Sequence, residues 1–347
     1  MAIIDKPSDY FNTKLYTGTG SSHAITGVGF APNWVWIKHR NEANPHKIFD
    51  TVRGVGKSLK SNSTDAEASN EENGYVSAFG SDGFTLVGGS TSSNDVNKSS
   101  GSYVAWNWKA NGAGSANTEG SVSATVSANT TAGFSIVQYN TAASGTQTMG
   151  HGLDSAPTFI ITKPTQNNES WYVYIPTGVS SSLRLNTTAG AVSSTAYAGT
   201  PTDTLFSINN GIIGGYTGVI SYCFAEKQGY SKFSSYVGNG NPDGSYIHLG
   251  FKPAFIMVKV TTTSNSYDDW IIYDNKRIGY NVAGNRKIYP SSAAAEPGDT
   301  DLIDLLSNGF KFRNSHSNAN GSGQTFIYMA FAESPFVTST GVPATAR

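Results

Sequence analysis

Carboxylate pairs are the first candidates for chemistry in this chain, because glycosidases cleave sugars with an acid and a base on neighbouring strands. Candidate carboxylates are Asp268 with Asp269, Glu226 with Glu333, and Glu71 with Glu72. Adjacent residues of a strand point to opposite faces, so Asp268 and Asp269 do not form such a pair. Glu226 and Glu333 close two similar segments, and we expect them to cap strands. The sequence therefore predicts no catalytic residues and a protein that is not an enzyme.

The histidines and acidic loops do not follow a metal-binding pattern. The six histidines are His23, His39, His46, His151, His248 and His316. No two of them have helical ligand spacing, and no Cys/His cluster accompanies them. His151 and His248 each precede a proline, and we expect both to be hydrogen-bonded structural residues. The acidic run 299–304 lacks the order of an EF-hand loop, and no phosphate-binding loop is present. We expect no metal and no cofactor.

Cys223 and the tryptophans are expected in the core. Cys223 is the single cysteine and stands between Tyr222 and Phe224, which favours a buried strand residue over a nucleophile. The six tryptophans are Trp34, Trp36, Trp106, Trp108, Trp171 and Trp270. Aromatic side chains dominate the cores of β-sandwiches, which is the interpretation we favour. The alternative is a sugar-stacking platform, and it requires at least one exposed tryptophan.

The composition narrows the class of protein. The 347 residues carry a net charge of −1, and only 14% are charged. Because nucleic-acid binders carry a basic face, the sequence predicts no nucleic-acid partner. There is no signal-peptide pattern and no apolar run of the ~18 residues that a membrane span needs. We expect a soluble protein made in the cytoplasm, without membrane insertion.

Glycine, tyrosine and phenylalanine are abundant, at 38, 18 and 17 residues, which is typical of strands and turns. Residues 299–307 are the one segment whose pattern suggests two helical turns. The sequence thus predicts an all-β protein.

An internal repeat is the main organising feature. Three segments each contain a proline, a strand of aromatic and β-branched residues, and a lysine six residues after the proline: Pro32 to Lys38, Pro157 to Lys163, and Pro253 to Lys259. Proline suits the entry of a strand because it cannot donate to the ladder. We expect each lysine to lie where its strand reaches water.

Further landmarks follow in the same order. An arginine comes next at Arg53, Arg184 and Arg277. Hairpin signals stand at Asp82-Gly83, Asn210-Gly211 and Asn308-Gly309. The closing strands are 103–109, 221–227 and 328–334.

The landmarks predict three divergent repeats of a β-sandwich of jelly-roll or concanavalin-like type. The expected divisions are repeat one at 1–110, a Gly/Ala/Ser/Thr-rich linker at 111–132, repeat two at 133–230, repeat three at 231–337, and a tail at 338–347. A thin edge strand is the alternative for the linker. The polar stretches 57–73, 88–101, 187–203, 290–300 and 314–324 are expected to be surface loops that carry contact function.

The chain resembles marine tailed-phage virion structural proteins, or tail-fibre-like proteins, with repeated concanavalin-like β-sandwich units. The motifs that carry the resemblance are Leu15-Tyr-Thr-Gly-Thr-Gly20, Ile25 to Lys38, Asp50-Thr-Val-Arg-Gly54, Asp82-Gly-Phe84, Tyr103 to Lys109 and Ala330-Phe-Ala-Glu333. It spans the three segments and is strongest in the first. The second lacks the Tyr-x-Gly-x-Gly turn and the Asp-x-x-Arg step.

The resemblance implies a structural protein of the virion: a tail fibre, an adhesin or a head-decoration component that presents loops for attachment or assembly. The implied partners are other capsid or tail proteins, a host surface glycan or receptor, and further copies of the chain, with a homotrimer favoured. The alternatives are a glycan-binding lectin-like module and, with least support, a polysaccharide depolymerase.

Overall fold

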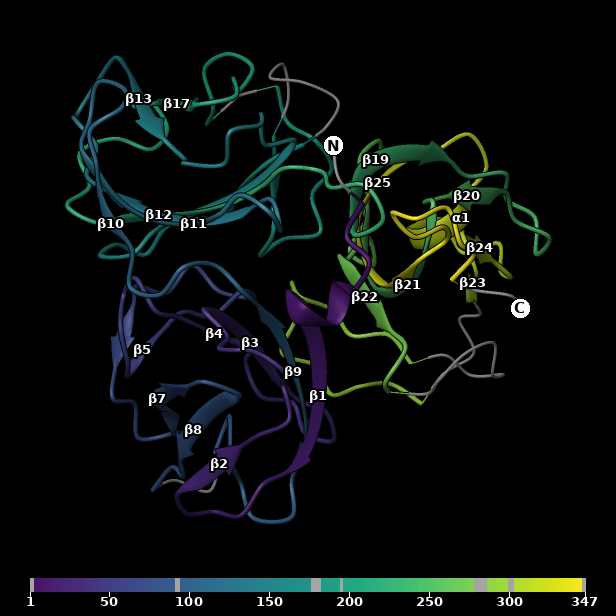
Figure 1. The fold of residues 1–347 in the computed structure, drawn as a ribbon, viewed down its shortest axis with the longest axis horizontal. Helices are drawn as coiled ribbons and strands as arrows, with labels where there is room; N and C mark the ends of the chain where they lie inside the picture. The colour runs from purple at the N-terminus through teal and green to yellow at the C-terminus, as the bar shows by residue number, and fades with distance from the viewer. Residues whose placement is uncertain are drawn as a thin grey trace.

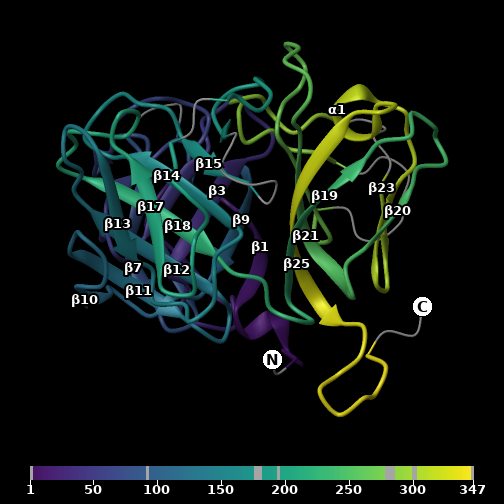
Figure 2. The same cartoon turned by 90° about the horizontal axis from the view of Figure 1, so that it is seen from above.

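The computed structural model describes residues 3–90, 94–175, 182–193, 196–277, 286–298 and 303–344. Strands dominate it, and the described helical elements are the short η1 (Pro7–Asp9) and α1 (Ser317–Asn320). The chain is therefore all-β, as its composition predicts. Figure 1 shows three lobes that lie against one another, and Figure 2 shows the C-terminal lobe beside the other two.

Three antiparallel sheets form the inner layer. The N-terminal sheet has the order β1-β9-β3-β4, and the C-terminal sheet has the order β19-β25-β21-β22. The seven-stranded middle sheet contains the run β12-β18-β14-β15, so each sheet places its closing strand between the opening strand and the strand that holds the Pro–Lys motif. The bounds are β1 (Phe11–Thr17), β3 (Trp34–His39), β4 (Lys47–Asp50), β9 (Ser102–Trp108), β12 (Phe134–Tyr139), β14 (Phe159–Pro164), β15 (Tyr172–Tyr174), β18 (Val219–Phe224), β19 (Ser231–Val237), β21 (Phe251–Val260), β22 (Ile271–Asp274) and β25 (Thr325–Pro335).

Smaller sheets form the outer layer. They have the orders β2-β8-β7, β13-β17 and β20-β24-β23, and each encloses an apolar cluster against one inner sheet. Sheet-on-sheet packing of this kind is the arrangement of a β-sandwich. The bounds are β2 (His23–Ile25), β7 (Tyr75–Gly80), β8 (Gly83–Val87), β13 (Thr146–Gly150), β17 (Leu205–Asn209), β20 (Tyr246–His248), β23 (Ile303–Leu306) and β24 (Gly309–Phe312).

The opposite faces of the three inner sheets meet in one shared core. Its apolar cluster takes aromatic side chains from all three sheets. The Trp34 ring stacks on Tyr222 of the middle sheet at 4.6 Å, and Trp108 lies edge-on to Phe255 of the C-terminal sheet at 5.6 Å. The six residues of β3, β14 and β18 are all buried, which explains why these strands are apolar on both faces.

Residues 111–132 contribute two strands to the edge of the middle sheet. These are β10 (Ser115–Asn117) and β11 (Ala124–Asn129), and β11 pairs with β12. The remaining short strands are β5 (Lys57–Ser58), β6 (Ala68–Ser69) and β16 (Leu183–Arg184). No helix in the described part of the chain is long and apolar enough to cross a membrane.

The helix expected at 299–307 is wrong where the structure describes it. Residues 299–302 lie outside the described residues, and Ile303–Leu306 form β23. Ile303 and Leu305 are buried while their neighbours are half-buried, which is the two-residue period of a strand. Pairing with β24 therefore makes this segment a strand, although its apolar residues are spaced as in a helix.

Two of the three expected hairpins are present. Gly80 pairs with Gly83 across the Asp82-Gly83 turn, and Leu306 pairs with Gly309 across the Asn308-Gly309 turn. At the remaining site, β17 ends just before Asn210, and it pairs with β13 and not with a strand that follows the Asn210-Gly211 turn. The second hairpin prediction is therefore wrong.

Candidate functional site at the seams between the sheets

The tryptophans do not form a surface platform. All six are at most 1% exposed and lie in the shared core. The core interpretation is confirmed, and a sugar platform built on tryptophan is excluded because it required at least one exposed ring. Aromatic packing supplies this burial, since each large ring removes a wide apolar area from water.

Cys223 and His151 lie in buried surroundings. Cys223 is fully buried, and burial raises the pKa of its thiol, which disfavours the nucleophilic thiolate. His151 is buried, with Nε2 3.1 Å from the Thr202 carbonyl oxygen and Nδ1 accepting from the Leu153 N–H. The exposed His248 lies 3.2 Å from the Tyr246 hydroxyl. Both histidines therefore have the hydrogen-bond partners that we expect from the sequence, and their structural role stays a prediction.

The predicted carboxylates have separate partners. Asp268 accepts from Asn265, whereas Asp269 accepts from the Ser291 hydroxyl at 2.7 Å. Each carboxylate is therefore held by its own loop.

The two glutamates of the closing segments also have partners of their own. Glu226 accepts the Phe233 N–H at 2.7 Å, a capping contact, and burial raises the pKa of this carboxyl group. Glu333 forms an ion pair with Lys252 at 3.0 Å. Among the described residues, no group of three or more His, Cys, Asp or Glu side chains could hold a metal ion.

Three lysines mark the contacts between neighbouring inner sheets, which we call seams. Lys38, Lys163 and Lys259 are fully buried, so the expectation that they reach water is wrong. Burial lowers the pKa of each to about 8. Each Nζ donates to the carbonyl of the following residue and to a carbonyl of its own loop.

Each lysine also donates to a carbonyl in a loop of the neighbouring unit. Lys163 of the middle sheet reaches Thr64 at 3.1 Å, which belongs to the N-terminal segment. Lys259 reaches Thr188 at 3.0 Å, and Lys38 reaches Ala293 at 3.2 Å. The three contacts therefore run in a closed ring around the shared core, one at each seam.

A backbone bond accompanies each lysine. The N–H groups of Glu67, Ala191 and Glu296 donate to the carbonyls of Thr165, Thr261 and Arg40, at 2.7, 2.9 and 2.7 Å. Each accepting residue lies two positions after one of the buried lysines. The polar loops 57–73, 187–203 and 290–300 thus clasp the neighbouring sheet, a role that their composition does not reveal.

Indole groups add a third contact at two seams. Trp171 Nε1 donates to the Lys60 carbonyl at 2.8 Å, and Trp270 Nε1 donates to the Arg184 carbonyl at 2.9 Å. Arg184 lies in β16, where it pairs with Tyr172, and not at the place of Arg53 and Arg277. The sequence match of these three arginines is therefore wrong for Arg184.

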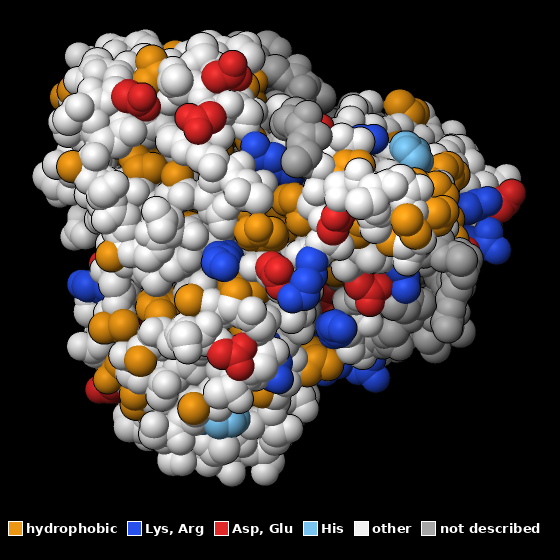
Figure 3. All heavy atoms as spheres, viewed as in Figure 1, with side chains coloured by type: hydrophobic (Ala, Val, Ile, Leu, Met, Phe, Trp, Pro, Cys, Tyr) orange, Lys and Arg blue, Asp and Glu red, His pale blue; other side chains and the backbone are white. Residues whose placement is uncertain are grey.

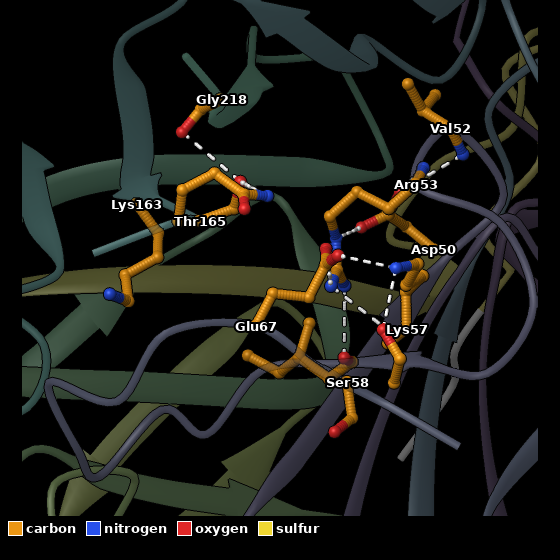
Figure 4. Close-up of polar contacts among 12 residues, drawn as sticks. Asp50, Val52, Arg53, Lys57, Ser58, Glu67, Lys163, Thr165 and Gly218 are labelled. Atoms are coloured by element: carbon orange, nitrogen blue, oxygen red, sulfur yellow. Dashed lines mark hydrogen bonds and ion pairs between the residues drawn. The ribbon is translucent and has the colours of Figure 1, made fainter. Parts of the chain in front are cut away.

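A buried charge cluster occupies the seam between the N-terminal and middle sheets (Figure 4). Arg53 Nε lies 2.5 Å from Asp50 and Arg53 Nη1 lies 3.2 Å from Glu67. The Tyr222 hydroxyl of the middle sheet donates to the same Asp50 carboxylate at 2.8 Å. Burial opposes the charge of Arg53, but Asp50, Tyr222 and Glu67 together raise its pKa.

The seam between the C-terminal and N-terminal sheets contains a matching cluster. Arg277 lies 2.6 Å from Asp274 and 3.3 Å from Glu296, and Trp106 of the N-terminal sheet donates to Asp274 at 3.0 Å. Arg40 also pairs with Glu296 across this seam. An aromatic donor of the adjoining closing strand thus completes each cluster.

The third seam is apolar at the corresponding positions. Ile175 follows β15 where Asp50 and Asp274 end their strands, Ala191 stands where Glu67 and Glu296 stand, and Met329 replaces the aromatic donor. Ile175 and Met329 both belong to the shared core. The missing Asp-x-x-Arg step of the second segment therefore coincides with an apolar partner strand.

An open hollow lies on the surface near the N-terminus. It has a volume of about 420 Å³ and is lined by residues that include Asp5, Lys6, Asp9 and Lys227. Its carboxylates are already engaged, because Asp9 pairs with Lys6 at 2.6 Å and Asp5 accepts from Ser339 at 2.7 Å. This hollow therefore offers no free carboxylate pair.

The fold and the seams together define an all-β protein in which buried polar groups connect the three inner sheets. Residues 6–335 match the family model described as a domain of unknown function, DUF7483, and the chain belongs to that family. Comparisons with curated proteins and with solved structures gave no match.

Proposed function

We propose that the chain is a structural, non-enzymatic protein of a tailed-phage virion, built from three divergent repeats of a β-sandwich unit. Its role would be that of a tail-fibre, adhesin or head-decoration component that presents loops for attachment or assembly. The single observation that carries the proposal is the ring of seam contacts, one lysine clasp at each seam.

The repeat is supported by position as well as by sequence. Trp34, Phe159 and Phe255 are buried residues that each lie two positions after the motif proline, and they pair with Trp108, Phe224 and Phe331 of the closing strands. The buried lysine and its clasping carbonyl then recur at equal intervals. The three segments share a strand register, a buried lysine and a loop contact. Triplication of one unit explains these shared features more simply than independent origins do.

A mechanical role follows from where the polar groups are used. Fully buried ammonium groups are costly unless every donor is satisfied, and here each seam lysine takes one of its accepting carbonyls from the neighbouring unit. Such contacts resist separation of the lobes without offering a reactive group to solvent. This favours a stiff particle component over a catalyst.

The outer surface suits contact with other macromolecules. The face in Figure 3 shows acidic, basic and hydrophobic side chains scattered singly or in small groups, and no large patch of one charge. The inner faces are filled by the shared core, so further copies would associate through outer surfaces. A homotrimer that forms through these outer surfaces remains a prediction.

The proposal is tested on particles of the phage that encodes the chain. Particles purified by density gradient are expected to contain the chain in many copies, and cryo-electron microscopy should place its three lobes on the head or tail. Purified particles that lack the chain would contradict the proposal.

A glycan-binding module is the second candidate, favoured by two exposed rings. Tyr246 and Tyr267 of the third lobe are 45% and 56% exposed, and aromatic faces of this kind can stack on sugars. Binding on a glycan array that is lost in Tyr267→Ala, with the fold intact, would favour this candidate. Release of oligosaccharides from host polysaccharide would instead indicate a depolymerase.

A further inference from the structure

A lysine and two carboxylic acids meet inside the first lobe, away from the seam ring. Lys47 lies in β4, Glu71 precedes β7, and Asp95 precedes β9. The Lys47 Nζ is 3.3 Å from Asp95 Oδ2 and also contacts Glu71 Oε2. The side chains of Lys47 and Asp95 are 0% and 1% exposed, and that of Glu71 is 14% exposed.

Asp95 differs from the other buried aspartates. Asp50 and Asp274 each accept hydrogen bonds from backbone and side-chain donors. Neither carboxyl oxygen of Asp95 accepts a hydrogen bond, and its contact is the Lys47 ammonium. Burial raises the pKa of the Asp95 carboxyl group, which favours its neutral form.

Glu71 is placed to carry protons between the two. Its Oε2 contacts the Lys47 ammonium and also accepts from the Ser58 hydroxyl. It is the more exposed carboxylate of the trio, so its ionised form is solvated where that of Asp95 is not.

We propose that Lys47 and Asp95 condense to an intramolecular amide bond, with Glu71 as the proton carrier. Glu71 takes a proton from the Lys47 ammonium, and the free amine attacks Cγ of the protonated Asp95 carboxyl group. The C–N bond forms, Glu71 gives its proton to the departing hydroxyl group, and one water molecule leaves. Glu71 then takes the second proton from the nitrogen, which leaves a neutral amide and a protonated Glu71. No oxidant, reductant or further reactant is needed.

The fold supplies the driving force that the reaction lacks in water. Two groups held at contact distance react as if at very high concentration, and a water-poor site disfavours the reverse hydrolysis. The neighbours Phe49, Val76 and Val96 are fully buried in the apolar cluster of this lobe. The bond would tie β4 to the segment before the closing strand, which adds a covalent lock to one lobe.

The test is the mass of the full-length chain and of its tryptic peptides. We expect the wild-type protein to be lighter than its sequence by one water molecule, with a branched peptide that joins Lys47 to Asp95. Lys47→Met and Asp95→Ala should restore the full mass. Separate Lys47 and Asp95 peptides at full mass in the wild type would overturn the proposal, and this readout does not require any variant to fold.

Two controls separate the chemistry from ordinary ion pairing. Glu71→Gln keeps both reacting groups and should leave them unjoined; an amide in this variant would refute the role of Glu71. Lys98 and Glu42 form an ion pair at 2.5 Å with both side chains more than a third exposed. Their peptides should remain separate, because solvation of both charges opposes condensation. Because Lys47→Met cannot form the bond, its thermal unfolding midpoint should be lower than that of the wild type.

Discussion

At the scale of single residues, the buried lysines show how strongly environment governs charge. Lysine is among the residues least often fully buried, yet the structure buries one at each seam. Their ammonium groups replace water with three or more carbonyl oxygens. Carbonyl dipoles satisfy the donors but do not neutralise the charge, which is why burial still lowers the pKa.

This lowered pKa predicts a pH dependence at Lys163. The pKa of Lys163 is about 8 in the folded chain, below the ordinary lysine value of 10.5. Between pH 8 and pH 10.5 the unfolded chain therefore binds the proton and the folded chain does not. Stability therefore rises with pH across this window and does not change below about pH 8 through this group. We expect the free energy of unfolding of the wild type, minus that of Lys163→Met, to increase from pH 8 to pH 10.5 in urea titrations.

Lys232 provides the matched control for that measurement. Its Nζ donates to one carbonyl, that of His248, at the surface. Lys232→Met controls for the loss of a lysine side chain over the same pH range. A flat difference for Lys163→Met would show that its pKa is not lowered.

The buried charge cluster at Asp50 predicts a large loss of folding stability when one of its members is removed. Arg53→Met leaves the buried Asp50 carboxylate without its guanidinium, and removal of one member of a buried pair costs about 3–5 kcal/mol. The third seam suggests the compensation, because it carries Ile175, Ala191 and Met329 at these places.

A four-fold variant therefore tests the logic of the seam. It combines Asp50→Ile, Arg53→Met, Glu67→Ala and Tyr222→Met, and it should recover a large part of the stability that Arg53→Met loses, as measured by chemical unfolding. A four-fold variant that is less stable than Arg53→Met would mean that the cluster contributes more than its own desolvation cost.

At the scale of elements, the contribution of an indole hydrogen bond to seam stability can be measured. The comparison is between a tryptophan that makes such a bond and a buried tryptophan that does not. Trp270 donates to the Arg184 carbonyl at 2.9 Å, whereas the buried Nε1 of Trp34 has no hydrogen-bond partner. Both rings are about 1% exposed. Trp270→Phe should therefore cost about 1–2 kcal/mol more than Trp34→Phe in urea unfolding, because it also leaves a buried carbonyl unpaired. Equal costs would indicate that the indole contact does not stabilise the seam.

Strands could be predicted from this sequence much better than their connections across space. The Pro–Lys motif locates β3, β14 and β21 because a proline, an apolar run and a lysine are local signals. The fate of the lysine is not local: the Thr64 carbonyl that accepts from Lys163 lies 99 residues away. The same reason explains why the loops 57–73, 187–203 and 290–300 were expected to face solvent, since polarity does not distinguish a loop that meets water from one that meets a neighbouring sheet.

At the scale of the whole molecule, the three lobes depend on one another. The shared core draws its aromatic side chains from every inner sheet, and each seam is closed by a loop of the next unit. Separation of the lobes would expose the inner faces of all three sheets at once. A chain of independent domains would have polar linkers and small interfaces instead.

Unfolding should therefore be a single event. We expect one calorimetric transition whose van't Hoff enthalpy approaches the measured enthalpy, because no lobe keeps its core alone. The fragment 1–110 should not fold, since Trp34, Trp106 and Trp108 would lose the rings of the other two sheets. Dispersed amide resonances from that fragment, or three separate calorimetric transitions, would show that each lobe is stable by itself and that the seams are interfaces between autonomous domains.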